Sequence, residues 1–140
     1  MIGKGKTMAK ILVIDDDPDV VLAARMCLED AGHAVSSASN GEEGLRQIKT
    51  APPDLIILDV MMDTATEGFQ LALKLRSSQA GSDLASFREI PILMLTAIHS
   101  TTPLRFAPDQ DYLPVEEFLD KPFEPKTLVR KVETLLKKGK

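Results

Sequence analysis

One short stretch of the chain, residues 54–62, restricts the possible folds more than any other. An unbroken apolar run, Leu55 to Leu58, follows two prolines and ends on a carboxylate, Asp59. A short apolar run bounded in this way indicates a strand buried on both faces, as in a parallel sheet, rather than a helix. Asp59 would then lie at the carboxyl end of the strand, which is the edge where open α/β sheets bind ligands.

Four further apolar segments have the length of strands, and they alternate with segments of helical periodicity. This alternation predicts one α/β domain with a parallel sheet, right-handed crossovers and helices on both faces. Residues 97–114 hold three prolines, so any helix there should be short or irregular. The predicted strands are residues 10–14, 33–38, 54–59, 90–95 and 115–119, and the predicted helices are 18–31, 42–49, 68–77 and a last one from Pro125 to Gly139.

The length of 140 residues fits a single domain with its own core. We expect that domain to span residues 9–138, with residues 1–8 as a flexible extension and residues 139–140 as a tail. The one cysteine, Cys27, excludes an internal disulfide and falls on the apolar face of the first helix, as a small core residue would.

Charge and hydropathy exclude several classes of partner. The net charge of −4, with basic residues spread along the chain, argues against direct nucleic-acid binding. No apolar run approaches the roughly 20 residues of a membrane helix, and the N-terminus has no apolar signal core. We therefore expect a cytoplasmic protein without a membrane partner. The two histidines, His33 and His99, are expected at the surface or at a strand edge.

Polar side chains that could take part in a reaction follow the predicted strands at one edge of the sheet. Asp15 and Asp16 follow the first strand, Asp59 ends the third, Thr96 follows the fourth and Lys121 follows the fifth. Carboxylates held close together repel one another and favour a hard cation such as Mg²⁺. A lysine, a hydroxyl and Mg²⁺ around a carboxylate nucleophile are the groups that phosphoryl transfer requires.

Four segments resemble the motifs of a known family. The resemblance is to the receiver domain of response regulators in two-component signalling, of the chemotaxis-receiver type, and it extends from Lys10 to Lys137. It implies a flavodoxin-like, doubly wound, five-stranded parallel sheet with strand order 2-1-3-4-5. The segments are Ile-Leu-Val-Ile-Asp-Asp-Asp-Pro, Leu-Ile-Ile-Leu-Asp-Val-Met-Met, Ile-Leu-Met-Leu-Thr-Ala and Phe-Leu-Asp-Lys-Pro-Phe.

The resemblance implies a role for each polar residue at the sheet edge. Asp59 matches the phosphoacceptor, Lys121 the lysine that pairs with the phosphoryl group, and Thr96 the switch hydroxyl. Phe118 matches the rotating switch aromatic. The implied Mg²⁺ ligands are Asp15, Asp16, Asp59 and the backbone carbonyl of Met61.

Simpler structural roles remain open for several of these residues. Thr96 could be a β-former that ends its strand, Lys121 a surface lysine, and Phe118 a half-buried strand residue. We interpret Asp17, the third acid after the first strand, as the cap of the helix that begins at Pro18.

The chain also departs from the family pattern. Asp63 replaces the usual proline of the loop after the third strand, and residues 97–114 do not match the usual regular helix. That second departure leaves the oligomeric state open. Two positions that the family uses to control hydrolysis hold the apolar residues Met61 and Ile98, which would orient water poorly. We therefore predict slow self-dephosphorylation.

The favoured function is a phosphorylation-activated signalling switch and not an enzyme. A sensor histidine kinase or phosphotransfer protein would phosphorylate Asp59, and output would pass to a downstream protein partner by protein contacts. One alternative is a pseudo-receiver that is never phosphorylated. A less favoured one is a Mg²⁺-dependent phosphohydrolase, because haloacid-dehalogenase-like enzymes need a second acid where this chain has Met61.

Overall fold

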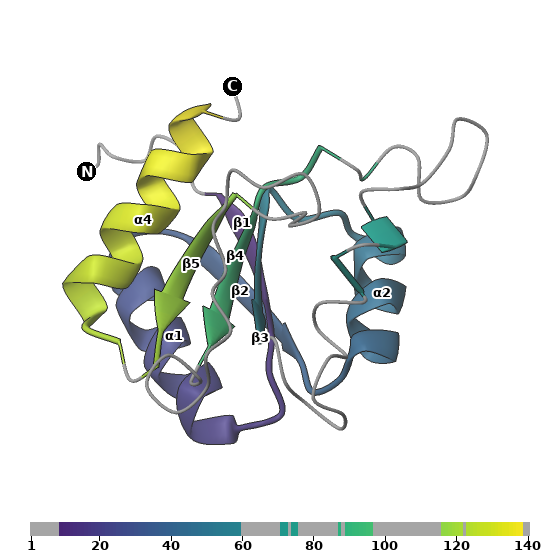
Figure 1. Ribbon diagram of the computed structural model, residues 1–140, viewed down its shortest axis with the longest axis horizontal. Coiled ribbons are helices and arrows are strands. Elements are labelled where there is room, and N and C mark those ends of the chain that lie inside the picture. Colours follow the sequence, from purple (N-terminus) through teal and green to yellow (C-terminus); the bar gives the residue numbers. More distant parts are fainter. Residues whose placement is uncertain are drawn as a thin grey trace, which may run out of the picture.

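The protein is an open α/β sheet with helices on both faces (Figure 1). The computed structural model describes residues 9–59, 71–72, 74–75, 87, 89–96, 116–121 and 123–138. The five parallel strands have the order β2-β1-β3-β4-β5, which confirms the predicted flavodoxin-like topology. The strands are β1 (Lys10–Ile14), β2 (Ala34–Ala38), β3 (Leu55–Asp59), β4 (Ile92–Thr96) and β5 (Glu117–Asp120), and the helices are α1 (Pro18–Asp30), α2 (Gly41–Thr50) and α4 (Pro125–Lys138).

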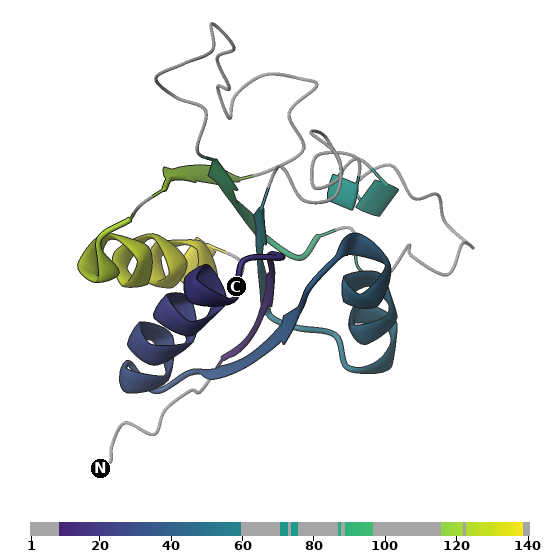
Figure 2. The ribbon, with the colours of Figure 1, turned by 90° about the horizontal axis from the view of Figure 1, so that it is seen from below.

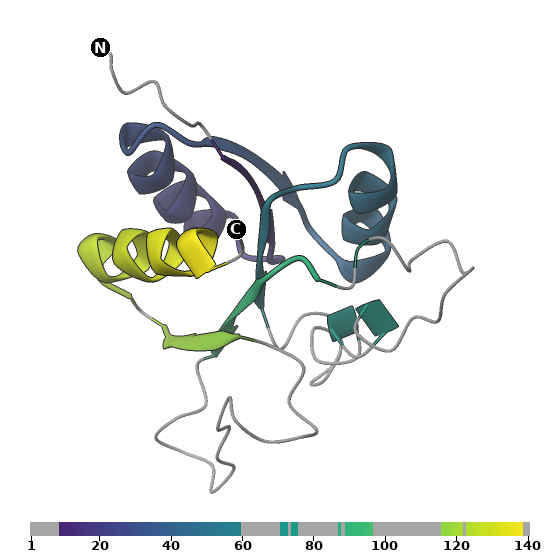
Figure 3. The same ribbon diagram turned by 90° about the horizontal axis from the view of Figure 1, so that it is seen from above.

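The sheet separates two apolar cores. On one face, α1 and α4 lie together against alternate residues of the strands (Figure 2). On the other face, α2 and the helical residues Leu71, Ala72 and Leu75 cover the remaining strand residues (Figure 3). β1, β3 and β4 occupy the middle of the sheet, so their side chains are buried on both faces, as the continuous apolar runs predict.

Local sequence signals explain where α1 begins and ends. Asp17 caps the helix, because its side chain accepts a hydrogen bond of 2.9 Å from the backbone N–H of Asp19. At the other end Gly32 has a φ of 99°, in the left-handed region that favours glycine. The N–H of Gly32 donates to the carbonyl of Glu29 and that of His33 to the carbonyl of Leu28, so the helix ends in a Schellman motif.

α2 approaches the sheet closely because of a glycine. Asn40 caps the helix through a 2.8 Å hydrogen bond from the N–H of Glu43 to its side chain. One turn into the helix, Gly44 faces Ile14 of β1. A Cβ atom at position 44 would lie 2.5 Å from Cδ1 of Ile14, which is closer than van der Waals contact allows. The absence of a side chain at this position therefore sets how near α2 can pack.

Two strands begin two residues later than predicted, and the other strand boundaries agree to within one residue. β4 begins at Ile92 rather than residue 90, because the N–H of Ile90 donates to the carbonyl of Phe87 in a turn and Pro91 has no N–H. β5 begins at Glu117, two residues later than predicted. Residues 97–114, with the expected irregular helix, and most of the predicted helix 68–77 lie outside the described residues.

One prediction about burial was wrong. Ala31 falls on the apolar stripe of the predicted helix 18–31, but it is exposed because it is the C-terminal cap of α1. His33 was expected at the surface or at a strand edge; it directly precedes the edge strand β2 and is half-buried, with its Nε2 3.4 Å from Oε2 of Glu133 on α4. No helix within the described ranges is long and apolar enough to span a membrane.

Candidate functional site

Three carboxylates meet at the carboxyl edge of the sheet. β1 and β3 are paired in parallel with Ile14 opposite Leu58, so the residues that follow β1 lie beside the last residue of β3. Asp15, Asp16 and Asp59 each offer one carboxylate oxygen, and these oxygens all lie within 4.8 Å of one another. Asp15 and Asp59 are buried, whereas Asp16 is exposed. The cluster is therefore open to solvent on the side of Asp16.

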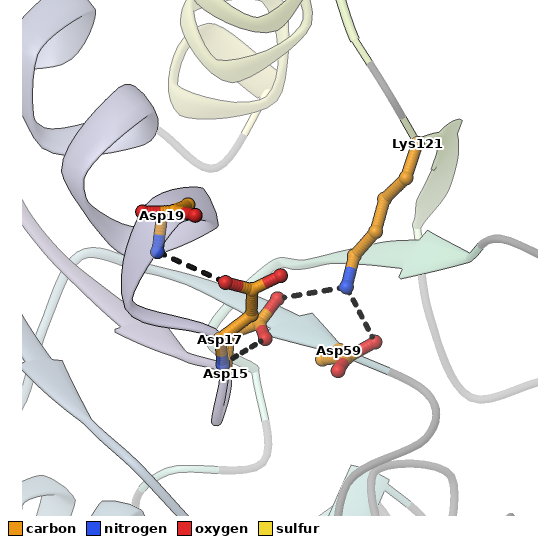
Figure 4. A network of polar contacts seen from close by, with 5 residues as sticks. All are labelled: Asp15, Asp17, Asp19, Asp59 and Lys121. Carbon is orange, nitrogen blue, oxygen red and sulfur yellow. Dashed lines mark hydrogen bonds and ion pairs between the residues drawn. The ribbon is translucent and has the colours of Figure 1, made fainter.

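Lys121 is the cation that faces this cluster. Its Nζ lies 3.1 Å from Oδ2 of Asp15 and 3.2 Å from Oδ1 of Asp59, as Figure 4 shows. Burial alone would lower the pKa of Lys121, but the two neighbouring carboxylates outweigh burial and raise the pKa above its ordinary value. Lys121 is therefore held in its charged form between the two buried acids.

Asp15 is held in place from two directions. Its Oδ1 accepts a 2.9 Å hydrogen bond from the backbone N–H of Asp17, and its Oδ2 is ion-paired with Lys121. Asp17 itself points its carboxylate at the start of α1, where it caps the N–H of Asp19 (Figure 4). The interpretation of Asp17 as a helix cap is thus confirmed.

Thr96 and Lys121 arrive at the site together. Thr96 is the last residue of β4 and is 5% exposed. The backbone N–H of Lys121 donates a 2.8 Å hydrogen bond to the carbonyl of Thr96, which ties the residue after β5 to the end of β4. The main chain therefore fixes the threonine and the lysine relative to each other at the same edge.

The remaining predicted site residues are less closely defined. Phe118 is half-buried on β5, opposite Met94 in the register, and packs against the core on the α2 face. A switch role for Phe118 stays a prediction. Met61 and Ile98 lie outside the described residues, so the structure tests neither the carbonyl ligand nor the hydrolysis positions.

The cluster fits a hard divalent cation. Its donors are carboxylate oxygens, which Mg²⁺ prefers, and one of the three acids is open to solvent, so a bound ion could keep part of its water shell. Three carboxylates face one lysine, so a divalent ion would balance the remaining negative charge. Asp15, Asp16 and Asp59 are the side chains that would hold it.

A surface hollow of about 640 Å³ adjoins the acids. Asp15 and Asp16 form part of its wall, and residues of α1, β2 and α2 form the rest. Leu22, which lines the hollow, is 54% exposed, and Met26 one turn further along α1 is 62% exposed. No sequence motif singles out this pair, although both residues are apolar and fall outside the buried stripe of α1.

Comparison with known proteins gives consistent results. The sequence model described as the response regulator receiver domain matches residues 11–133. The chain is 31% identical to the chemotaxis response regulator CheY4 of Vibrio cholerae, with a TM-score of 0.74 over 92% of this chain and 99% of that one. The receiver domain of the Francisella response regulator 1452 is 28% identical, with a TM-score of 0.74, and the match covers 94% of this chain and 99% of that one.

Curated relatives are longer than this chain. The alkaline phosphatase synthesis transcriptional regulatory protein PhoP of Bacillus subtilis is 32% identical over 93% of this chain and 49% of its own length. The response regulator MprA of Mycobacterium ulcerans is 35% identical over 94% of this chain and 51% of its own length. The chain thus spans about half the length of these relatives.

Proposed function

Because the chain belongs to the response regulator receiver domain family, we propose that it is a signalling switch that accepts a phosphoryl group on Asp59. The observation that carries this proposal is the position of Asp59. It is buried at the end of β3, within the acidic cluster, and its Oδ1 lies 3.2 Å from Nζ of Lys121. A carboxylate nucleophile next to a fixed cation is suited to in-line attack on phosphorus.

The proposed transfer makes one bond and breaks one. An oxygen of Asp59 attacks the phosphorus of a phosphohistidine in a sensor histidine kinase or phosphotransfer protein. The P–N bond breaks, its electron pair stays on the imidazole, and an acyl phosphate forms on Asp59. Lys121 then exchanges its contact with the Asp59 carboxylate for one with a phosphoryl oxygen. When bound, Mg²⁺ would neutralise part of the charge on the transferring oxygens.

The arrangement favours Asp59 over its two acidic neighbours as the acceptor. Asp15 is 1% exposed, and both of its oxygens are held, one by the N–H of Asp17 and one by Lys121. Asp16 is exposed, and no ion pair joins it to Lys121 among the contacts of the described residues. We therefore propose that Asp15 and Asp16 serve the metal alone, whereas Asp59 is both a metal ligand and the acceptor, and that the Met61 carbonyl is the fourth, family-implied ligand.

We propose that the switch transmits its state through protein contacts. Thr96 is buried at the end of β4, and its carbonyl accepts a hydrogen bond from the backbone N–H of Lys121. In this proposal the Thr96 hydroxyl senses the phosphoryl group on Asp59. Phe118, on the neighbouring strand, is the proposed second part of the readout. We place the folded switch in residues 9–138 and its action in the cytoplasm.

The exposed pair Leu22 and Met26 offers a docking surface for the phosphodonor protein. The two side chains lie one helical turn apart on α1, and Leu22 lines the hollow that contains Asp15 and Asp16. Leu22→Ser/Met26→Ser should slow transfer from any histidine kinase that phosphorylates the unaltered chain, and leave phosphorylation by acetyl phosphate unchanged. Equal loss with both donors would contradict this assignment.

One mass measurement tests the central proposal. The protein is incubated with Mg²⁺ and acetyl phosphate, and its intact mass is recorded over time. We expect one phosphoryl group per chain, lost in Asp59→Asn and retained in Asp54→Asn, a control in which the altered acid precedes the same strand. No adduct on the unaltered protein would favour a pseudo-receiver, and continuous hydrolysis of acetyl phosphate without an adduct would favour a phosphohydrolase.

The lifetime of the adduct tests the proposed slow self-dephosphorylation. After removal of acetyl phosphate, the phosphorylated fraction is followed by mass in Mg²⁺. Polar replacements, Met61→Asn or Ile98→Glu, should shorten the half-life because they can orient an attacking water. A half-life that these replacements leave unchanged would contradict the prediction.

A further inference from the structure

The free edge of the sheet at β2 has a defined set of outward-facing groups. Among the strands of the described residues, β2 pairs with β1 alone and is therefore an edge strand. The N–H of Ala34 donates to the carbonyl of Ala9, and the carbonyl of Ala38 accepts from the N–H of Asp15. Because alternate residues of a parallel strand face the same neighbour, Val35 and Ser37 direct their N–H and carbonyl groups away from β1.

Side chains from two helices occupy both outward carbonyls. Nη2 of Arg25, on α1, donates a 3.1 Å hydrogen bond to the carbonyl of Val35. Nε2 of Gln47, on α2, donates a 2.8 Å hydrogen bond to the carbonyl of Ser37. The two helices cover opposite faces of the sheet, so the edge is capped from both sides (Figure 2).

The strand has no other protection of the kinds that edge strands commonly use. Its sequence, Ala-Val-Ser-Ser-Ala, contains no charged residue and no proline. The opposite edge strand β5 differs, because Glu117 and Asp120 carry charge and Glu117 is ion-paired with Lys131 at 3.3 Å. An uncharged edge of small residues is a surface on which an identical strand could pair.

We propose that Arg25 and Gln47 close the β2 edge against strand addition by a second copy of this chain. A second copy is the relevant partner because a two-fold axis would set the same edge antiparallel to itself, with each outward carbonyl as an acceptor. With both carbonyls already bonded, a second strand would have to share or displace two hydrogen bonds in each copy. The two side chains thereby direct association of this protein away from the sheet and toward its helical surfaces.

The test replaces both donors by side chains of similar size. Arg25→Met keeps the aliphatic stem without the guanidinium, and Gln47→Met removes the amide donor at similar size without adding a charge. We expect the double variant to dimerise at least about tenfold more tightly than the unaltered protein, measured by light scattering across a concentration series. Each single variant should lie between the two.

A matched control separates the lost hydrogen bonds from the change in charge. Arg46→Met/Ala23→Met alters the same two helices at exposed positions and changes the net charge by the same amount. This control should stay as monomeric as the unaltered protein. If it dimerises equally, charge rather than capping is responsible and the proposal is overturned.

A third substitution locates the contact. The N–H of Ser37 faces outward, so Ser37→Pro removes no bond to β1 but prevents pairing at the edge. Added to Arg25→Met/Gln47→Met, it should restore the monomer. A folded double variant that stays monomeric, or a dimer that survives Ser37→Pro, would overturn the proposal. Amide exchange gives an independent readout, because dimerisation should protect the N–H groups of Val35 and Ser37, and unchanged exchange counts against it.

Discussion

Leu58 and Asp59 are neighbours on β3 and are almost equally buried, with exposed fractions of 0% and 4%, yet they belong to two different kinds of region. Leu58 lies in the apolar interior of the sheet, packed in the core on the α2 face. Asp59 lies at the carboxyl edge, where it shares one lysine with a second buried acid. Between these two neighbouring residues, the surroundings change from apolar side chains that stabilise the fold to carboxylates that repel one another.

The comparison shows how the fold supports a costly site. Buried apolar side chains of the interior each contribute about 1.5–3 kcal/mol to folding. Carboxylates of like charge at the edge oppose folding unless a cation or hydrogen bonds compensate them. We therefore expect substitutions in the interior to destabilise the protein, and neutralisation at the edge to stabilise it while removing the chemistry.

The largest effect is expected for Leu58→Ala. Loss of a fully buried leucine from the centre of the sheet should lower the free energy of unfolding by about 2–5 kcal/mol. Urea denaturation followed by circular dichroism measures it. Leu22→Ala, at a position 54% exposed, is the control and should change stability by less than about 0.5 kcal/mol. Similar losses at both positions would remove the distinction between interior and surface.

Gly44→Ala tests whether the interior can accept added volume. The new Cβ would meet Cδ1 of Ile14, so we expect a loss of about 1–3 kcal/mol in the free energy of unfolding. Ile14→Val removes that methyl group, and in its presence the added cost of Gly44→Ala should fall below about 1 kcal/mol. A double-mutant cycle by urea denaturation measures the coupling. If the effects of Gly44→Ala and Ile14→Val on stability are strictly additive, the whole of α2 moves to accommodate the new Cβ and the Ile14 side chain does not.

Asp59→Asn should have the opposite sign. Removal of one of three clustered charges should raise the free energy of unfolding by about 1 kcal/mol without Mg²⁺. The unaltered protein should in turn gain about 2.7 kcal/mol at a Mg²⁺ concentration 100 times its Kd, and the variant should gain much less. Thermal or urea unfolding with and without Mg²⁺ tests both statements. Destabilisation by Asp59→Asn without the ion would contradict the idea that the edge is costly.

The smallest effect is expected for Cys27, a nucleophile that lies on α1 and not at the carboxyl edge of the sheet. Burial, with a smaller contribution from the charge of Asp30, raises the pKa of the Cys27 thiol above its ordinary value. Alkylation by iodoacetamide at pH 8 should therefore be slower, by about tenfold, in the folded protein than in urea. The pH dependence of the folded rate should have its midpoint above that of the unfolded thiol. Equal rates in the two states would show that the thiol is not protected.

The sequence pattern predicts both the parallel sheet and the convergence of the acids, for a common reason, whereas the strand order was implied only by the resemblance to the receiver family. Polar residues directly after apolar runs must meet at the carboxyl edge once the strands are parallel, so Asp15, Asp59 and Lys121 can be placed together without coordinates. Local signals likewise predict Asp17 as a cap, since the bond it accepts lies within two residues.

Features that depend on contacts between distant segments could not be predicted in this way. Half-buried His33 contacts Glu133, one hundred positions later, and no pattern around residue 33 indicates that contact. The hydrogen bonds from Arg25 and Gln47 to the β2 carbonyls depend on how far each helix is offset along the sheet. Periodicity gives the face of a helix but not this offset.

The hydrogen bond between Asp15 and the backbone N–H of Asp17, just before α1, affects how much negative charge the acidic cluster can hold. The N–H of Asp17 points at Asp15, and α1 starts directly beyond it, so the positive end of the helix dipole lies next to the acidic cluster. A helix N-terminus of this kind acts as roughly half a positive charge that does not titrate, although salt screens it. The cluster therefore lies next to a second source of positive charge besides Lys121, one that does not depend on the protonation of a side chain.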